Sequence, residues 1–228
     1  MMHIPEQWLT QECVSAALGQ PRRGVGIAVF RNAAIDRTLA RAHPMFPIAF
    51  FGPIVIITAG AAHRSGHIAL EVATFVAGWL LLSLIEYLLH RFYFHRSTPS
   101  SREGRIEAFL AHGYHHQYPQ DITRLVLPPL ATVPLAIFVF ALAHFTLGVT
   151  GDMLFAGILT GYIAYDTLHY VTHHTHAKRG PFAWLRRYHM LHHHDRVPGR
   201  YGVSSPLWDF ALRTYAPLKS QRSSNKAV

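Results

Sequence analysis

The segment 166-DTLHYVTHHTHAKRGPFAWLRRYHMLHHHD-195 holds eight histidines within thirty residues. Residues three or four positions apart lie on one face of a helix, so His169 and His173 direct their rings the same way. His189 and His193 repeat that spacing. Neutral imidazole is the commonest metal ligand among protein side chains, and it suits iron, zinc and copper. The segment therefore predicts a histidine cage that holds metal.

Two shorter histidine clusters lie upstream, in HRFYFH (90–95) and HGYHHQ (112–117). A structural zinc needs four ligands and a catalytic zinc three plus water, so this many histidines exceed the needs of one ion. Two ions with about five ligands each would use them. Because histidine binds metal only when neutral, we expect loading to fail below about pH 6.5, the ordinary pKa. Isolated histidines are read as ordinary packed or surface residues: His3, His43, His63, His67 and His144.

The composition favours a membrane protein. Half of the 228 residues are hydrophobic, only 14% are charged, and the formal net charge is +9. The basic residues are spread over three segments without a nucleic-acid-binding motif, so we expect no nucleic-acid partner and assign the charge to a membrane surface. The single cysteine, Cys13, excludes an intramolecular disulfide framework and a thiolate-rich zinc site.

Four apolar runs predict an all-α integral membrane fold. At 1.5 Å per residue, each run is near the length that crosses a hydrocarbon core of ~30 Å. Short polar turns join the runs into two hairpins, so we expect a membrane-embedded domain over 46–215. It follows a cytosolic or interfacial segment over 1–45 and precedes a disordered tail over 216–228. The expected spans are about 45–62, 68–89, 125–149 and 153–168.

Lysine and arginine predict the orientation of these spans, because short loops rich in them stay in the cytosol. The segments before the first span, between the hairpins and after the last span hold five, five and ten of them. The two hairpin loops together hold one, Arg64. All three histidine clusters are therefore expected on the cytosolic face, where the spans bring them together.

Two carboxylates share a helical face with a histidine. Asp166 stands three residues before His169, and Glu86 stands four before His90. Metal-bound histidines usually donate their second N–H to a carboxylate or carbonyl, so we expect these two acids to orient the ligands. For Glu86, an ordinary carboxylate at the membrane interface is an equal alternative.

At these clusters the sequence resembles the fatty acid hydroxylase/sterol desaturase superfamily, and within it the fatty acid 2-hydroxylases. The resemblance covers about residues 78–215. The HxxHH pattern alone is a weak signal, and the match is specific because several sequence pieces occur together. The matching pieces are EYLLHRFYFH (86–95), HGYHHQYPQD (112–121), RLVLPP (124–129), GYIAYDTLHYVTHH (161–174), LRRYHMLHHH (185–194) and YGVSSPLWDF (201–210).

The resemblance implies a ligand set and some neighbouring roles. It places His174 at a position that is histidine without necessarily binding metal, and it leaves His176 and His194 unassigned. Tyr201 and Trp208 are candidates for covering the substrate, with interfacial packing as the alternative. The implied ligands are His90, His95, His112, His115, His116, His169, His173, His189, His192 and His193.

The resemblance also implies a reaction. Four spans would carry a cytosolic helical cap with two iron ions, which use O₂ to hydroxylate a fatty acyl chain at C2, often on a sphingolipid. Zinc in purified samples is compatible, because it outcompetes ferrous iron at nitrogen sites. The chain leaves no room for the cytochrome b5 domain of many relatives, so we expect a separate donor of cytochrome b5 or ferredoxin type. The host membrane is a bacterial inner membrane or the endoplasmic reticulum.

Two alternatives stay open from the sequence. A desaturase or a sterol or carotenoid hydroxylase would use the same scaffold. A non-catalytic metal-binding or transport protein is disfavoured, because transporters place their ligands near the bilayer midplane, whereas these histidines stand at span ends.

Overall fold

The computed structural model describes residue 30 and residues 32–64, 66–97, 99–195 and 197–218. All the regular elements in these ranges are helices, so the predicted all-α class is confirmed. Cys13, His3 and most of the expected N-terminal segment lie outside the described residues. So does nearly all of the expected disordered tail.

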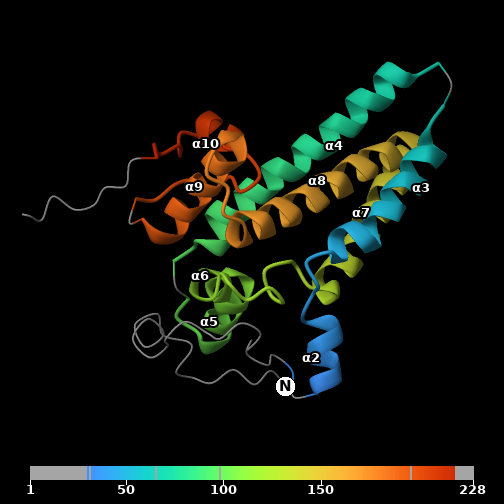
Figure 1. Ribbon diagram of the computed structural model, residues 1–228. Helices are drawn as coiled ribbons and strands as arrows, with labels where there is room; N and C mark the ends of the chain where they lie inside the picture. The colour runs from blue at the N-terminus through green and yellow to red at the C-terminus, as the bar shows by residue number, and fades with distance from the viewer. Residues whose placement is uncertain (1–29, 31, 65, 98, 196, 219–228) are drawn as a thin grey trace, which may run out of the picture.

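The helix α8 (Val149–His174) is the centre of the bundle (Figure 1). It packs against α3 (Gly52–Ala62), α4 (Ile68–Leu88) and α7 (Pro129–Leu147). Its contact with α4 is the most extensive, because glycines let the two backbones touch. A Cβ atom added at Gly157 would lie 2.0 Å from the carbonyl oxygen of Phe75. Small residues at helix crossings allow this close approach in membrane proteins.

Within the described residues, two helices are long and apolar enough to cross a membrane, Ile68–Phe94 and Pro129–Leu147. Few of their residues are buried within the protein, unlike those of a core helix in a soluble protein. Large apolar side chains point outward instead: Phe145 is 85% exposed and Ile137 is 65% exposed. An outward apolar surface of this extent fits contact with lipid rather than water.

The helix limits differ from the expected spans. The first helical run, the π-helix η2 (Pro47–Phe51) continued by α3, is shorter than the other two. α4 continues into the π-helix η3 (Leu89–Phe94), because no helix-breaking residue lies between them. α7 begins only at Pro129, since Pro128 before it is extended. α8 includes the expected turn at its start and reaches His174, so it extends beyond the expected span at both ends.

The two predicted hairpins differ in their packing. α7 and α8 meet at Gly148 and pack against each other. α3 and α4 are joined by a short turn, but both pack chiefly on α8 rather than on each other. The bundle is therefore built around α8 rather than from two equal hairpins.

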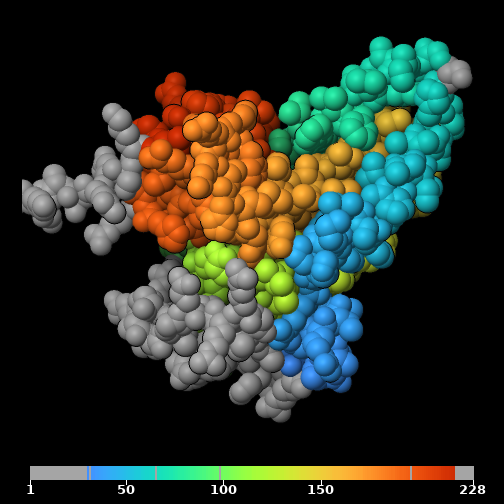
Figure 2. All heavy atoms as spheres, in the orientation of Figure 1, coloured from blue at the N-terminus to red at the C-terminus, as the bar shows by residue number. Residues whose placement is uncertain are grey.

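The remaining helices gather at one end of the bundle, away from the turn between α3 and α4 (Figures 1 and 2). Two of them, η3 and η4, are π-helices that contact each other. Such segments are rare and often mark functional sites. The elements are η3, α5 (Arg102–Ala108), η4 (Phe109–Gly113), α6 (Tyr114–Gln117), α9 (Gly180–His194) and α10 (Leu207–Ala211).

A short helix before the bundle, α2 (Ala33–Leu39), is tied to the segment that precedes α7. Its Asp36 is buried and forms ion pairs with Arg41 at 2.8 Å and Arg124 at 3.2 Å. Asn32 caps the helix by accepting from two backbone amides. α2 thereby lies against the entry to α7.

Candidate metal centre

Ten histidines come together at this end of the bundle in two groups of five, in each of which the ligand atoms lie within 4.8 Å of one another. They are the same ten that the resemblance implied as ligands. η3, η4, α6, α8 and α9 supply nine of them, and His95 directly follows η3. The first histidine group is His90, His95, His112, His116 and His192, and the second is His115, His169, His173, His189 and His193.

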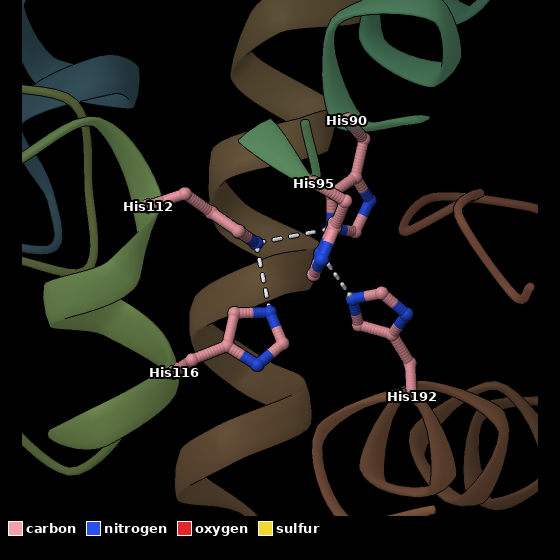
Figure 3. Close-up of side chains that lie close together, drawn as sticks. All are labelled: His90, His95, His112, His116 and His192. Carbon is pink, nitrogen blue, oxygen red and sulfur yellow. Dashed lines mark hydrogen bonds between the residues drawn. The ribbon is translucent and has the colours of Figure 1, made fainter. Parts of the chain in front are cut away.

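The first group directs its Nε2 atoms toward a common centre (Figure 3). The Nε2 atom of His90 lies 3.0 Å from that of His112 and 3.2 Å from that of His95. The His112–His116 and His95–His192 nitrogen pairs are each separated by 3.0 Å. Five nitrogens from three stretches of the chain thus surround one point.

Backbone carbonyls fix the proton on two of these rings. The Nδ1 atom of His90 donates to the Tyr201 carbonyl at 2.5 Å, and that of His192 donates to the Gly199 carbonyl at 3.0 Å. A neutral imidazole carries one N–H, so the Nε2 atoms of both rings present lone pairs to the centre. Inward lone pairs repel one another and attract a cation, so this donor set fits a metal ion.

The second group has the same inward geometry. The Nε2 atom of His115 lies 2.9 Å from that of His169 and 3.0 Å from that of His193. The His173 and His189 nitrogens are 2.8 Å apart. In the described part of the chain, no hydrogen-bond acceptor meets the buried Nδ1 atoms of His115, His173, His189 and His193. Packing among the rings therefore holds these side chains.

Burial keeps the histidines neutral. Desolvation is the main cause that lowers the pKa of His95 to about 4, that of His192 to about 3 and that of His116 to about 2. Neighbouring histidines add to the effect at His192 and His116, because two imidazolium ions repel each other. All three rings are uncharged at neutral pH, as metal binding requires.

Because these pKa values are lowered, we expect the protein to lose its metal at a lower pH than the sequence alone predicts. A metal-loaded sample is expected to keep its metal at pH 5.5, a full unit below 6.5, and to lose it as the pH falls towards about 4. Each lowered pKa also means that the unfolded chain binds more protons between the two values. The apo protein should therefore lose stability as the pH falls below about 6.5.

Metal per chain after desalting at stepped pH, with circular dichroism on the same samples, measures both effects. Half-loss of metal near pH 6.5 with the helices intact would contradict the lowered pKa values.

The two carboxylates expected to orient ligands bind backbone instead. Glu86 accepts from the amide of Val203 at 2.8 Å and from the amide and hydroxyl of Ser204 at 3.1 and 2.8 Å. The partner of His90 is therefore a carbonyl, and Glu86 acts on the loop that supplies it. Asp166 accepts from the amide of Leu127 at 3.2 Å, which holds the segment before α7 against α8.

The other predicted residues take varied places. His174 stacks on Tyr170 outside both groups, and His176 and His194 also lie outside them. Trp208 donates from Nε1 to Ser83 Oγ at 2.9 Å, which fits the packing alternative. Tyr201 lies beside His95 with a centroid separation of 5.7 Å. Sequence reasoning missed Gly199, whose backbone carbonyl accepts from His192, because every residue carries such a group. It also missed Asp209, whose side chain accepts from the amides of Tyr201 and Gly202.

A cavity of about 100 Å³ opens beside both groups. His112, His115 and His169 line it together with apolar side chains, among them Leu110 and Leu127. Arg124 and Asp166 also line it. The apolar part of this lining, next to the histidine nitrogens, suits an alkyl segment.

The match to known proteins covers this whole region. The model of the fatty acid hydroxylase family matches residues 75–214, which include all ten histidines. The chain belongs to this family. A solved structure titled full-length scs7p, with only the hydroxylase domain visible, superposes with a TM-score of 0.74 at 33% identity. That match covers 84% of this chain and 73% of the other.

Curated relatives carry consistent names. Dihydroceramide fatty acyl 2-hydroxylase FAH2 of Arabidopsis thaliana is 38% identical over 82% of this chain and 77% of its own length. Fatty acid 2-hydroxylase of Homo sapiens is 38% identical over 64% of this chain and 40% of its own length. Ceramide very long chain fatty acid hydroxylase SCS7 of Saccharomyces cerevisiae is 37% identical over 89% of this chain and 54% of its own length. The chain thus spans about half or less of the human and yeast relatives.

Proposed function

We propose that this protein is a membrane oxygenase that hydroxylates a fatty acyl chain at C2, with the acyl group free or carried on a ceramide-like lipid. The observation that carries the proposal is the pair of five-nitrogen groups within a match to hydroxylases of this name. In the overall reaction one oxygen atom of O₂ enters a C–H bond. The other leaves as water after two electrons and two protons are supplied.

The two histidine groups would each hold one iron ion, and bound iron would activate O₂. The chain itself supplies the neutral imidazoles and fixes two of their protons at Nδ1 through carbonyls. Nitrogen ligands with few carboxylates distinguish this site from the glutamate-rich di-iron bundles. Zinc would occupy the same nitrogens in a purified sample.

The cavity beside the histidines positions the substrate. An acyl chain would enter laterally from the bilayer, with its polar head near the helices that carry the histidines. Leu110 and Leu127 would hold the alkyl carbons and exclude water next to the reacting C–H bond. The backbone contact of Asp166 with Leu127 keeps that wall in place.

The bundle crosses the membrane four times in this proposal, with the histidine end as a cytosolic cap over a membrane-embedded domain of residues 46–215. The excess of lysine and arginine at the histidine end supports this orientation. The same basic surface would dock an acidic electron carrier of cytochrome b5 or ferredoxin type. Labelling of cysteines introduced at His67 and Lys178, in a Cys13→Ser background, would report on opposite sides of the membrane.

The reaction is tested with a saturated fatty acid that carries deuterium at C2, supplied to cells that express the chain. Mass spectrometry is expected to find a lipid that has gained one oxygen and lost one deuterium. A product that has lost two hydrogens without gaining oxygen would identify a desaturase instead. Where no product forms, membranes supplied with a reductase and carrier protein separate a missing donor from a wrong reaction.

A further inference from the structure

The loop over residues 199–204, here called the carbonyl loop, supplies both acceptors that orient the first histidine group. The carbonyl of Tyr201 accepts from His90, which stands on η3. The carbonyl of Gly199 accepts from His192, which stands on α9. One short segment without regular structure therefore sets two rings that come from distant parts of the chain.

Two buried carboxylates hold this loop in shape. Asp209 accepts from the amides of Tyr201 at 2.9 Å and Gly202 at 2.8 Å, and from the hydroxyl of Thr214 at 2.7 Å. Glu86 holds the following two residues, Val203 and Ser204, through their amides. Asp209 is 0% exposed, so its contacts form without competition from water.

The loop also has no room for side chains at its tightest point. A Cβ atom at Gly202 would lie 2.1 Å from the Ser205 carbonyl oxygen and 3.0 Å from Asp209 Oδ2. The backbone at Gly202 must therefore approach both groups closely. A shift of this backbone would move the Tyr201 carbonyl, its immediate neighbour, away from His90.

We propose that Asp209 and Glu86 are positioning residues that act through the carbonyl loop to set the metal affinity of the first histidine group alone. Within the described residues the second group receives no acceptor from this loop, because the close contacts of its Nε2 atoms join its own rings. The inference rests on the proposed metal binding. It adds the residues that set the metal affinity of the first histidine group. Partners that orient metal-bound histidines typically contribute 10- to 100-fold in affinity.

The test measures Zn²⁺ binding to the full-length apo protein in detergent, by competition with a chelator. In Asp209→Asn the amide nitrogen meets backbone N–H groups, so the loop loses at least one acceptor. We expect one Zn²⁺ to bind roughly 10- to 100-fold more weakly and the other to keep its affinity. The matched control is Asp36→Asn, a buried carboxylate that holds α2 through arginines, for which both affinities stay unchanged.

Double variants assign the weakened site. Asp209→Asn combined with His90→Ala should bind one Zn²⁺ as tightly as His90→Ala alone, because both changes affect the first group. Asp209→Asn combined with His173→Ala should weaken the one remaining Zn²⁺. Equal weakening of both sites, as a merely structural role would give, overturns the proposal. So does weakening confined to the second group.

If Asp209→Asn does not fold, two further variants test the same proposal. Glu86→Gln weakens the hold on Val203 and Ser204, whereas Gly202→Ala adds a Cβ atom against the Ser205 carbonyl. Each is expected to weaken the same single site. Unchanged affinity in a folded Gly202→Ala protein would refute the inference. Absence of Zn²⁺ binding by the unaltered protein would instead refute the proposed function, so the two failures are distinguishable.

Discussion

Cells that express the His112→Ala/His116→Ala variant are expected to make no detectable 2-hydroxylated acyl lipid. The two substitutions remove adjacent nitrogens, 3.0 Å apart, from the first histidine group and leave it three ligands. His112 also lines the cavity, so its loss opens the place where the alkyl chain would lie. Lipid mass spectrometry beside the unaltered chain measures the effect, and metal per chain should fall from two ions to one.

The matched control is His144→Ala. This histidine stands on α7, is exposed, and pairs with Asp152 at 2.8 Å, outside both groups. Its product yield should equal that of the unaltered chain at equal protein level. Product from the double variant at the unaltered level would show that the first group does not take part in the reaction.

Gly157→Ala is expected to destabilise the protein by roughly 1–3 kcal/mol or more, because overpacking forces the backbones apart. The new Cβ atom would lie 2.0 Å from the Phe75 carbonyl oxygen, and backbone cannot rotate away as a side chain can. α4 leads into His90, and α8 carries His169 and His173. Separation of these two helices should therefore lower metal content together with stability.

Gly60→Ala is the control, because its effect on stability is expected to have the opposite sign. On α3, a Cβ atom at Gly60 meets nothing within 4 Å, and alanine has the higher helix propensity by about 1 kcal/mol. Thermal unfolding in detergent should show a lower midpoint for Gly157→Ala and an equal or higher one for Gly60→Ala. An unchanged midpoint for Gly157→Ala would show that α4 and α8 are not in direct backbone contact.

The buried carboxylates illustrate where sequence reasoning stopped. Glu86 and Asp166 each share a helical face with a histidine, and helical spacing is visible in a sequence. Their hydrogen bonds go instead to Val203 and Leu127, which are distant in the chain. Long-range partners of this kind follow from packing, and no local pattern encodes them.

The sequence by itself determined the helical class, the apolar runs and the three histidine clusters, because helical periodicity and residue chemistry are local properties. The family match follows from the same residues. Only the tertiary structure decided how the ten divide into two groups, since His112 and His115 are three residues apart yet belong to different groups. It also decided that α8 is the central helix and that the carbonyls of Gly199 and Tyr201 face two rings. Every residue has a carbonyl, so only the folded chain shows which ones meet a histidine.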